Sequence, residues 1–147
     1  MFRGEYHQSI DPKGRIILPA KFRELLSAQY DQNLVIAKHV LDKCLMAFPV
    51  AEWILKENEL KKVPTGSREV RMFKRVFMAS ASECTMDRQG RIVIPPSLKQ
   101  FAGFDKSIVI AGAIDHFEIW DKTLFIGLED KIQESKEIQA ILDTLNF

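Results

Sequence analysis

A short motif occurs twice in this chain of 147 residues, and it constrains the fold more than any other feature. Residues 10–19 read IDPKGRIILP, and residues 86–95 read MDRQGRIVIP. The aspartate, glycine, arginine and proline match in both copies, and three aliphatic residues follow each arginine. Internal repetition of this kind indicates that one structural unit is present twice. The match continues more loosely downstream, where apolar runs occur at residues 34–37 and 107–111.

Each copy is predicted to form a β-hairpin that leads into a short helix. Aspartate at the first turn position and glycine at the fourth favour a type I turn closed by a left-handed glycine. We therefore expect Gly14 and Gly90 to adopt positive φ. Pro19 and Pro95 are each placed to open a helix, and β-rich segments follow both helices.

The two copies are expected to share one core, because a unit of roughly 45 residues buries too little apolar surface alone. The predicted fold class is α+β. Two repeats, at residues 5–50 and 80–123, interleave into one compact β-barrel-like body with pseudo-twofold symmetry. Helices are predicted outside the repeats at residues 50–79 and 121–147: two helices in the first segment and an amphipathic helix in the second.

The net charge of +1 conceals an uneven distribution of basic residues. A near-neutral total by itself argues against nucleic-acid binding. However, residues 1–23 hold five basic and two acidic residues, and residues 61–75 hold six and one. Residues 121–147 hold three basic and six acidic residues. A protein with one basic face can bind phosphate despite a neutral sum.

The repeated turn places basic side chains at or next to two exposed tips. Asp11 and Asp87 can each hold the neighbouring arginine or cap the turn, which would fix the direction of the guanidinium group. Arginine on a β-element can contact guanine bidentately and can also clamp phosphate. One such turn alone is usually an ordinary solvated turn. Two copies strongly support a duplicated module and support DNA binding less strongly. The basic residues of the two tips are Lys13, Arg15, Arg88 and Arg91.

These residues carry a resemblance to a known family. The opening residues 1–6, the stretch 11–23 and the second motif at 87–91 closely resemble the MraZ family. This family belongs to the SpoVT/AbrB-like swapped-hairpin group, and the similarity covers nearly the whole chain. The resemblance implies a bacterial DNA-binding transcriptional regulator, usually a repressor, that acts in the cytoplasm at the nucleoid. It also implies a ring-shaped homo-oligomer that binds short direct repeats in double-stranded DNA. These repeats lie upstream of the cell-division and cell-wall gene cluster that includes the regulator's own gene.

The family motif corresponds here to four residues, and neighbouring residues complete the predicted site. Arg3 and Lys13 flank the first motif, and Arg88 occupies the second turn. Gln89 stands where the first copy has Lys13, so the tips are expected to differ, and which one reads bases stays open. A ring would present identical tips at regular spacing, which suits direct repeats and adds avidity. The motif residues are Asp11, Arg15, Asp87 and Arg91, with Gly14 and Gly90 in support.

Other functional classes find less support in the sequence. The three histidines are scattered without metal-ligand spacing, and no nucleophile elbow or glycine-rich phosphate loop occurs. We therefore expect no enzyme activity, cofactor or metal site. Apolar runs are too short to cross a bilayer, and the first residues lack a signal-peptide core, so a cytosolic protein without membrane contact is expected. The alternative hypothesis is an oligomeric interaction scaffold or antitoxin-like protein whose basic tips bind an acidic protein.

Several further residues are interpreted as structural. Cys44 and Cys84 lie in apolar surroundings and are expected to be buried, inert thiols. Trp53 and Trp120 fall within apolar patterns and are interpreted as core or interface anchors. A second basic group, on the helix expected at 67–79, favours a solvated or interprotomer surface slightly over DNA. Its residues are Arg68, Arg71 and Arg75.

Overall fold

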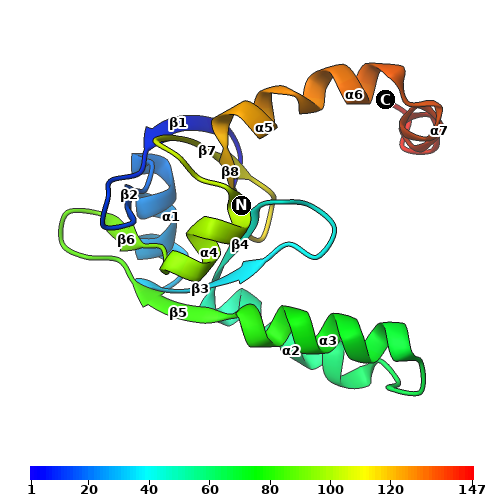
Figure 1. Cartoon of the computed structure of the whole chain (residues 1–147), viewed down its shortest axis with the longest axis horizontal. Helices are drawn as coiled ribbons and strands as arrows, with labels where there is room; N and C mark the ends of the chain where they lie inside the picture. Colours follow the sequence, from blue (N-terminus) through cyan, green and yellow to red (C-terminus); the bar gives the residue numbers. More distant parts are fainter.

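A computed structural model describes residues 1–147 and contains a six-stranded antiparallel sheet, a separate two-stranded ribbon and seven helices. In Figure 1 a β-rich body carries two helical arms that extend from the same side, one formed by α2 and α3 and the other by α5 to α7. The strands are β1 (Glu5–Ser9), β2 (Arg15–Ile17), β3 (Asn33–Lys38), β4 (Leu45–Pro49), β5 (Ser82–Thr85), β6 (Arg91–Val93), β7 (Ser107–Gly112) and β8 (Phe117–Asp121). The helices are α1 (Ala20–Gln29), α2 (Val50–Lys62), α3 (Arg68–Ser80), α4 (Pro96–Ala102), α5 (Lys122–Ile126), α6 (Leu128–Glu134) and α7 (Lys136–Thr144).

Strand pairing joins the two halves of the chain. The sheet order is β1-β7-β8-β4-β3-β5. The early strand β1 pairs with the late strand β7, and β5 pairs with β3. The first strand of each half therefore lies in the sheet beside a strand of the other half. The mixed α+β class is confirmed, and each half contributes three strands to one shared sheet.

The predicted barrel is not closed. The edge strands β1 and β5 do not pair with each other, and β2 pairs only with β6 to form the separate ribbon. Ladder pairing between the ribbon and the sheet is limited to one isolated bridge, between Ile10 and Ile16.

The ribbon has local twofold symmetry. Its register centres on Ile16 opposite Ile92, which occupy the same position in the two motif copies. Both side chains are fully buried, so the inner face of the ribbon closes the main core. The flanking pairs are Arg15 with Val93 and Ile17 with Arg91.

The central strands bury both of their faces. Leu34 and Ile36 of β3 belong to the main core, which the ribbon, α1 and α4 cover. Val35 and Ala37 face the other way and belong to a second cluster beneath α2 and α3. A third cluster around Trp120 lies beneath α5. Burial on both faces explains why the apolar runs are continuous instead of alternating.

The helices begin and end largely where the sequence predicts. Pro19 and Pro95 stand at the N-caps of α1 and α4, and Gly103 ends α4 with a φ of 67°. The pair α2 and α3 agrees with the two helices expected between the halves. The C-terminal segment differs, because one helix was expected and three short ones form. The chain breaks at Gly127 and again at Ser135, whose hydroxyl accepts a hydrogen bond from the first turn of α7.

The tryptophans and one cysteine are buried as expected, whereas the other cysteine is only partly buried. Trp53 and Trp120 are buried in the two outer clusters. Cys44 is buried and Cys84 is partly buried, and both are free. Burial raises the pKa of the Cys44 thiol far above its ordinary range and that of Cys84 to about 11. Both groups therefore stay protonated at neutral pH and behave as small apolar side chains.

Candidate nucleic-acid interface

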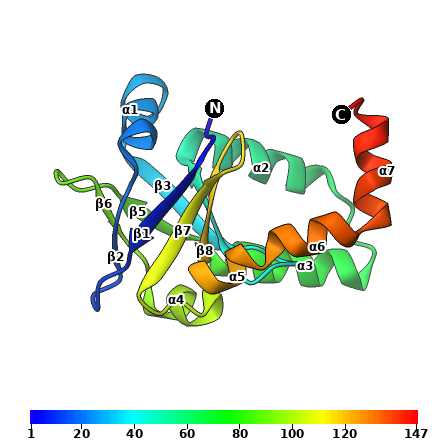
Figure 2. The ribbon, with the colours of Figure 1, turned by 90° about the horizontal axis from the view of Figure 1, so that it is seen from above.

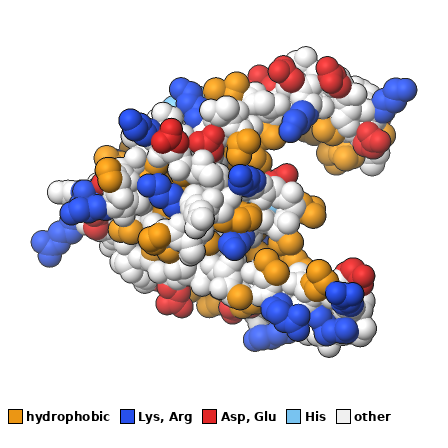
Figure 3. Space-filling model, in the orientation of Figure 1, with side chains coloured by type: hydrophobic (Ala, Val, Ile, Leu, Met, Phe, Trp, Pro, Cys, Tyr) orange, Lys and Arg blue, Asp and Glu red, His pale blue; other side chains and the backbone are white.

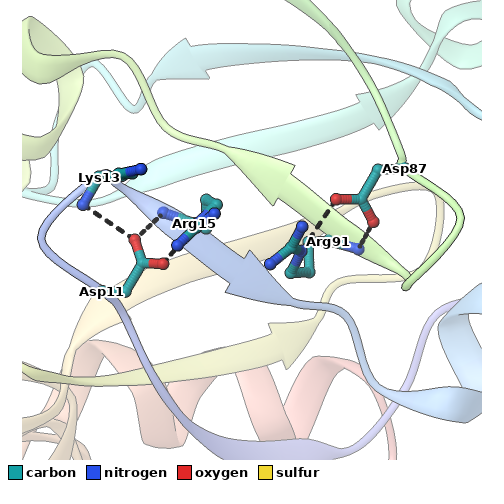
Figure 4. A network of polar contacts seen from close by, with 5 residues as sticks. All are labelled: Asp11, Lys13, Arg15, Asp87 and Arg91. Carbon is teal, nitrogen blue, oxygen red and sulfur yellow. Dashed lines mark hydrogen bonds and ion pairs between the residues drawn. The ribbon is translucent and has the colours of Figure 1, made fainter.

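The first turn is held by the carboxylate of Asp11. Its Oδ1 accepts hydrogen bonds from the backbone N–H groups of Lys13 at 2.9 Å and Arg15 at 2.8 Å. Its Oδ2 accepts a third bond from Arg15 Nε, which is also an ion pair (Figure 4). The N–H of Gly14 donates to the carbonyl of Asp11 at 2.9 Å, and Gly14 has a φ of 79°, as predicted. One carboxylate thus fixes both the turn and the direction of the guanidinium group.

The second turn repeats this arrangement. The carboxylate of Asp87 accepts from the backbone N–H groups of Gln89 and Arg91, both at 2.9 Å. It also accepts from Arg91 Nε at 2.9 Å. Gly90 donates to the carbonyl of Asp87 at 3.0 Å and has a φ of 78°. The sequence predicts that each aspartate holds its arginine or caps its turn, and in the structure each does both.

Both aspartates are ionised at neutral pH. The pKa of Asp11 lies below its usual value of 3.8, chiefly because the backbone N–H of Arg15 donates to the charged form. The pKa of Asp87 is lowered chiefly by the backbone N–H of Arg91. In each case the hydrogen bond and charge of the arginine side chain add to this effect. The carboxylates therefore hold the arginines throughout the physiological pH range.

The two arginines share the outer face of the ribbon. Because side chains alternate along a strand, burial of Ile16 and Ile92 places Arg15 and Arg91 on the opposite face. Figure 4 shows the two arginines next to each other, with an aspartate at either side. Their side chains are 35% and 29% exposed. Each aspartate binds Nε, and no hydrogen bond within the chain uses the terminal nitrogens of either guanidinium group. Those nitrogens are free to contact a ligand.

Two apolar side chains complete this outer face. Ile17 is 50% exposed and Val93 is 52% exposed, and each lies opposite an arginine in the ribbon register. The outer face is therefore a two-stranded surface that offers both cationic and apolar contacts.

The turns project beside this face. Lys13 and Arg88 are exposed. Figure 2 shows the two turns at the same end of the molecule, opposite the helical arms. Basic side chains protrude at that end in the space-filling view (Figure 3). The structure thus brings Lys13, Arg15, Arg88 and Arg91 to one region, as the sequence predicts.

Two basic residues that the sequence analysis did not single out lie beside the turns. Arg23 of α1 packs against Gly90: a methyl group placed on that glycine would lie 2.5 Å from Arg23 Cδ. Its Nε is buried without a hydrogen-bond partner. Lys99 of α4 lines a hollow of about 600 Å³ together with Lys13 and Gly14. A sequence signal did exist, because each is a basic residue four positions after a helix-opening proline. Each turn therefore has a cation from a helix of the other half beside it.

Arg3 is not brought to the ribbon. It follows Phe2, which bridges to Ile114, and it precedes β1, whereas Asp11 follows the far end of that strand. Strands rise about 3.3 Å per residue, so the length of β1 separates Arg3 from the turn. Arg3 instead lines a shallow hollow with Lys21 of α1.

The basic residues of α3 lie away from the ribbon, on one of the helical arms (Figures 1 and 2). Arg71 donates to the carbonyls of Thr65 and Gly66, and Lys74 donates to the carbonyl of Val63. These bonds hold the loop between α2 and α3. The arm and the ribbon are therefore two separate basic regions.

No group of three or more His, Cys, Asp or Glu side chains is arranged to hold a metal ion. None of the helices combines the length and the apolar character that crossing a bilayer requires.

Comparison with known proteins gives consistent matches over the full length. The sequence model of a family described as "MraZ protein, putative antitoxin-like" matches residues 1–76 and again residues 77–145. The chain is 40% identical to the transcriptional regulator MraZ of Halothermothrix orenii, over 100% of both chains. It is 44% identical to the transcriptional regulator MraZ of Caldicellulosiruptor bescii, over 96% of this chain and 94% of that one. The solution structure of PHS018 from Pyrococcus horikoshii aligns with a TM-score of 0.35 at 14% identity, covering 81% of this chain and 88% of that one. That likeness is too weak to support an argument.

Proposed function

The chain belongs to the MraZ family, and from this premise we propose that it regulates transcription by binding double-stranded DNA through the outer face of the β2–β6 ribbon. The observation that carries the proposal is the pair of arginines on that face. Arg15 and Arg91 are each fixed through Nε and have free terminal nitrogens. A regulator of this kind has no need of catalytic chemistry.

The ribbon suits the major groove of DNA. That groove admits a two-stranded β-ribbon, and a guanidinium group can bind guanine O6 and N7 with two parallel hydrogen bonds. Because the aspartates hold the arginines before DNA arrives, less side-chain entropy is lost on binding. Ile17 and Val93 are apolar and exposed beside them, which suits contact with thymine methyl groups. Arg15 and Arg91 are proposed to read bases.

The surrounding cations are proposed to bind phosphate. Contacts to phosphate position a protein on the duplex and supply most of its salt dependence. The turn residues flank the ribbon, and the helix residues lie directly behind the turns. Arg3 is too far along β1 to share this contact, so any role in DNA binding would be peripheral. The proposed phosphate-binding residues are Lys13, Arg88, Arg23 and Lys99.

Family membership suggests the biological setting of this binding. We propose that the protein is a repressor, acts in the cytoplasm at the nucleoid and assembles into a homo-oligomeric ring. Its sites are proposed to be short direct repeats upstream of the cell-division and cell-wall gene cluster that includes its own gene. We also propose that residues 5–50 and 80–123 are two swapped-hairpin repeats. The pairing of β1 with β7 and of β5 with β3 supports that description.

The test is binding to DNA from upstream of the protein's own gene, measured by fluorescence anisotropy across a salt series. Replacing both Arg15 and Arg91 by alanine should weaken specific binding at least about 30-fold, because each lost guanine contact is worth about 1–3 kcal/mol. The matched control replaces both by lysine. This keeps the charge but removes the bidentate geometry, so non-specific binding should survive while sequence preference falls.

Wild-type affinity in the double alanine variant would show that the ribbon is not the DNA-binding face. The competing function is an interaction scaffold or antitoxin-like protein. A stoichiometric acidic protein partner in a pull-down, without preference among DNA sequences, would favour that alternative.

A further inference from the structure

The C-terminal arm presents an apolar surface that nothing in the chain covers. No residue of α5, α6 or α7 is buried. In α7 and its C-cap residue the aliphatic residues recur at intervals of three, one and three, which places them on one helix face. A helix of nine residues is marginal in water without tertiary contacts, so this face needs a partner. Its residues are Ile138, Ile141, Leu142 and Leu145.

The other arm offers a surface of matching character. Helix α3 turns Phe73 and Phe77 toward the second core cluster. Helical spacing places Arg68, Met72, Arg75 and Val76 together on a neighbouring face, whose edge at Val76 lies beside Phe73. Met72 and Val76 are each 49% exposed. The outer face of α3 therefore combines apolar residues with two arginines that form no ion pair in the chain.

The charges of the two arms are opposite. Residues 128–144 hold five acidic and two basic residues, whereas α3 holds four basic residues and one acidic residue. No ion pair within the chain involves a charged residue of α3, α6 or α7. Charges left without a partner in both arms, in addition to two uncovered apolar faces, indicate that the arms are complementary.

The arms do not meet within one molecule. Figure 1 shows α7 and the α2–α3 pair well separated, and Figure 3 shows an open gap between them with apolar side chains on both of its borders. The partner of one arm is thus not the other arm of the same chain.

We propose that the α6–α7 segment of one molecule packs on the outer face of α3 in the next molecule. This inference rests on the ring assembly proposed above and names the contact that would build it. The contact joins two different surfaces, so it repeats head to tail and closes into a ring when the rotation allows. Because both arms lie opposite the ribbon end, every ribbon in the assembly stays accessible to DNA (Figure 2).

The decisive experiment reverses the charges of the two arms separately. One variant carries Arg68→Glu and Arg75→Glu, and the other carries Glu134→Lys and Glu137→Lys. Light scattering and native mass spectrometry of the full chain should show large assemblies for wild type and a shift to monomers for each variant. Mixing the two variants should restore assembly. The acidic α3 of one variant can then pair with the basic C-terminal arm of the other, and their two unchanged arms can pair as in wild type. A chain with all four substitutions should also assemble. Glu83→Lys, an exposed reversal outside the arms, is the matched control and should behave as wild type.

A second variant tests the apolar face. Ile141→Asp with Leu145→Asp changes two exposed side chains, so the thermal unfolding of the body should be unchanged while assembly is lost. Wild-type assembly in this variant and in both charge variants would overturn the proposal, as would a monomeric wild type at micromolar concentration. Unchanged mass with weaker DNA binding in the Arg68→Glu, Arg75→Glu variant would also overturn it and would assign α3 to DNA. The variant with alanine at Arg15 and Arg91 separates the two proposals, because it should assemble normally whether or not it binds DNA.

Discussion

The two turns share one backbone frame but differ in what surrounds their glycines. In both, an aspartate accepts three hydrogen bonds and a glycine adopts a φ near 80°. A methyl group on Gly14 would lie 2.6 Å from the backbone oxygen of Ile94. The same group on Gly90 would instead meet the side chain of Arg23. A side chain added to the first turn would thus meet backbone, and one added to the second would meet a movable cation, although a backbone N–H of the other half donates to both glycine carbonyls.

The charged residues of the turns differ as well. Lys13 stands in the first turn where the second has Gln89. The cation behind the first turn, Lys99, lines an open hollow, whereas Arg23 packs directly on the second turn. The repeated aspartate, glycine and arginine therefore fix the geometry, and residues of the opposing helix decide which charges accompany it. A duplicated frame can in this way present two different surfaces to one ligand.

The largest difference between the two turns is expected in the loss of folding stability when each glycine is replaced by alanine. Positive φ alone costs an L-residue about 1–2 kcal/mol, and both substitutions incur that cost. Gly14→Ala adds a clash with backbone that cannot move aside, so we expect a total of about 3 kcal/mol or more. Gly90→Ala should stay near about 1–2 kcal/mol, because Arg23 can move. Urea denaturation of both variants measures the difference.

The order of the two variants should be reversed for DNA binding, provided that both fold: Gly90→Ala should weaken binding more than Gly14→Ala. Gly90→Ala displaces Arg23 and should weaken binding more than its modest loss of stability suggests. Gly103→Ala is a suitable control, since this glycine also has positive φ but ends α4 and meets only the end of the Lys43 side chain. Equal destabilisation at positions 14 and 90 would show that the two turns have equivalent surroundings.

The frame of the turns could be predicted because it depends on local sequence. The positive φ of Gly14 and Gly90 follows from the residues that this turn type prefers. The prolines at the N-caps of α1 and α4 follow from the fixed φ of proline, which suits the start of a helix. The shared outer face of Arg15 and Arg91 needed one further assumption, that the two repeats pair with each other. The ribbon shows that the assumption is correct, because β2 and β6 of the two repeats pair with each other.

Long-range features could not be predicted in the same way. The contact of Arg23 with Gly90 joins a helix of one half to a turn of the other, and no local rule states which elements of two repeats will meet. The open sheet depends on how far β1 and β2 diverge after the turn. The position of Arg3 follows from the direction of β1, although in the sequence it lies only eight residues before Asp11.

Exchanging the turn residues should show a smaller difference. Each phosphate contact contributes about one unit to the slope of log affinity against log salt. Lys13→Gln should therefore lower that slope by about 1, and Gln89→Lys should raise it by about 1. A chain with both exchanges should recover the wild-type slope. The control Lys62→Gln lies on the α2 arm and should leave the slope unchanged. An unaltered slope in Gln89→Lys would place the second tip away from phosphate.

Acid sensitivity should reveal the smallest difference between the turns. The pKa values of Asp11 and Asp87 are lowered in the folded protein, so their contribution to stability is complete above the usual value of 3.8. It is lost as the pH falls through the lower pKa values of the folded state. Asp11→Asn and Asp87→Asn should each be less stable than wild type at pH 7 and lose less stability on acidification to pH 3. Because the two aspartates accept equivalent hydrogen bonds, the two variants should respond alike in thermal unfolding across this range.

Some acid sensitivity should remain in the double variant, since the pKa of Asp115 is also lowered: burial opposes this, but the hydrogen bonds and charges of His116 and Lys56 outweigh it. A response confined to one variant would mean that the turns differ in the frame itself and not only in the residues around it.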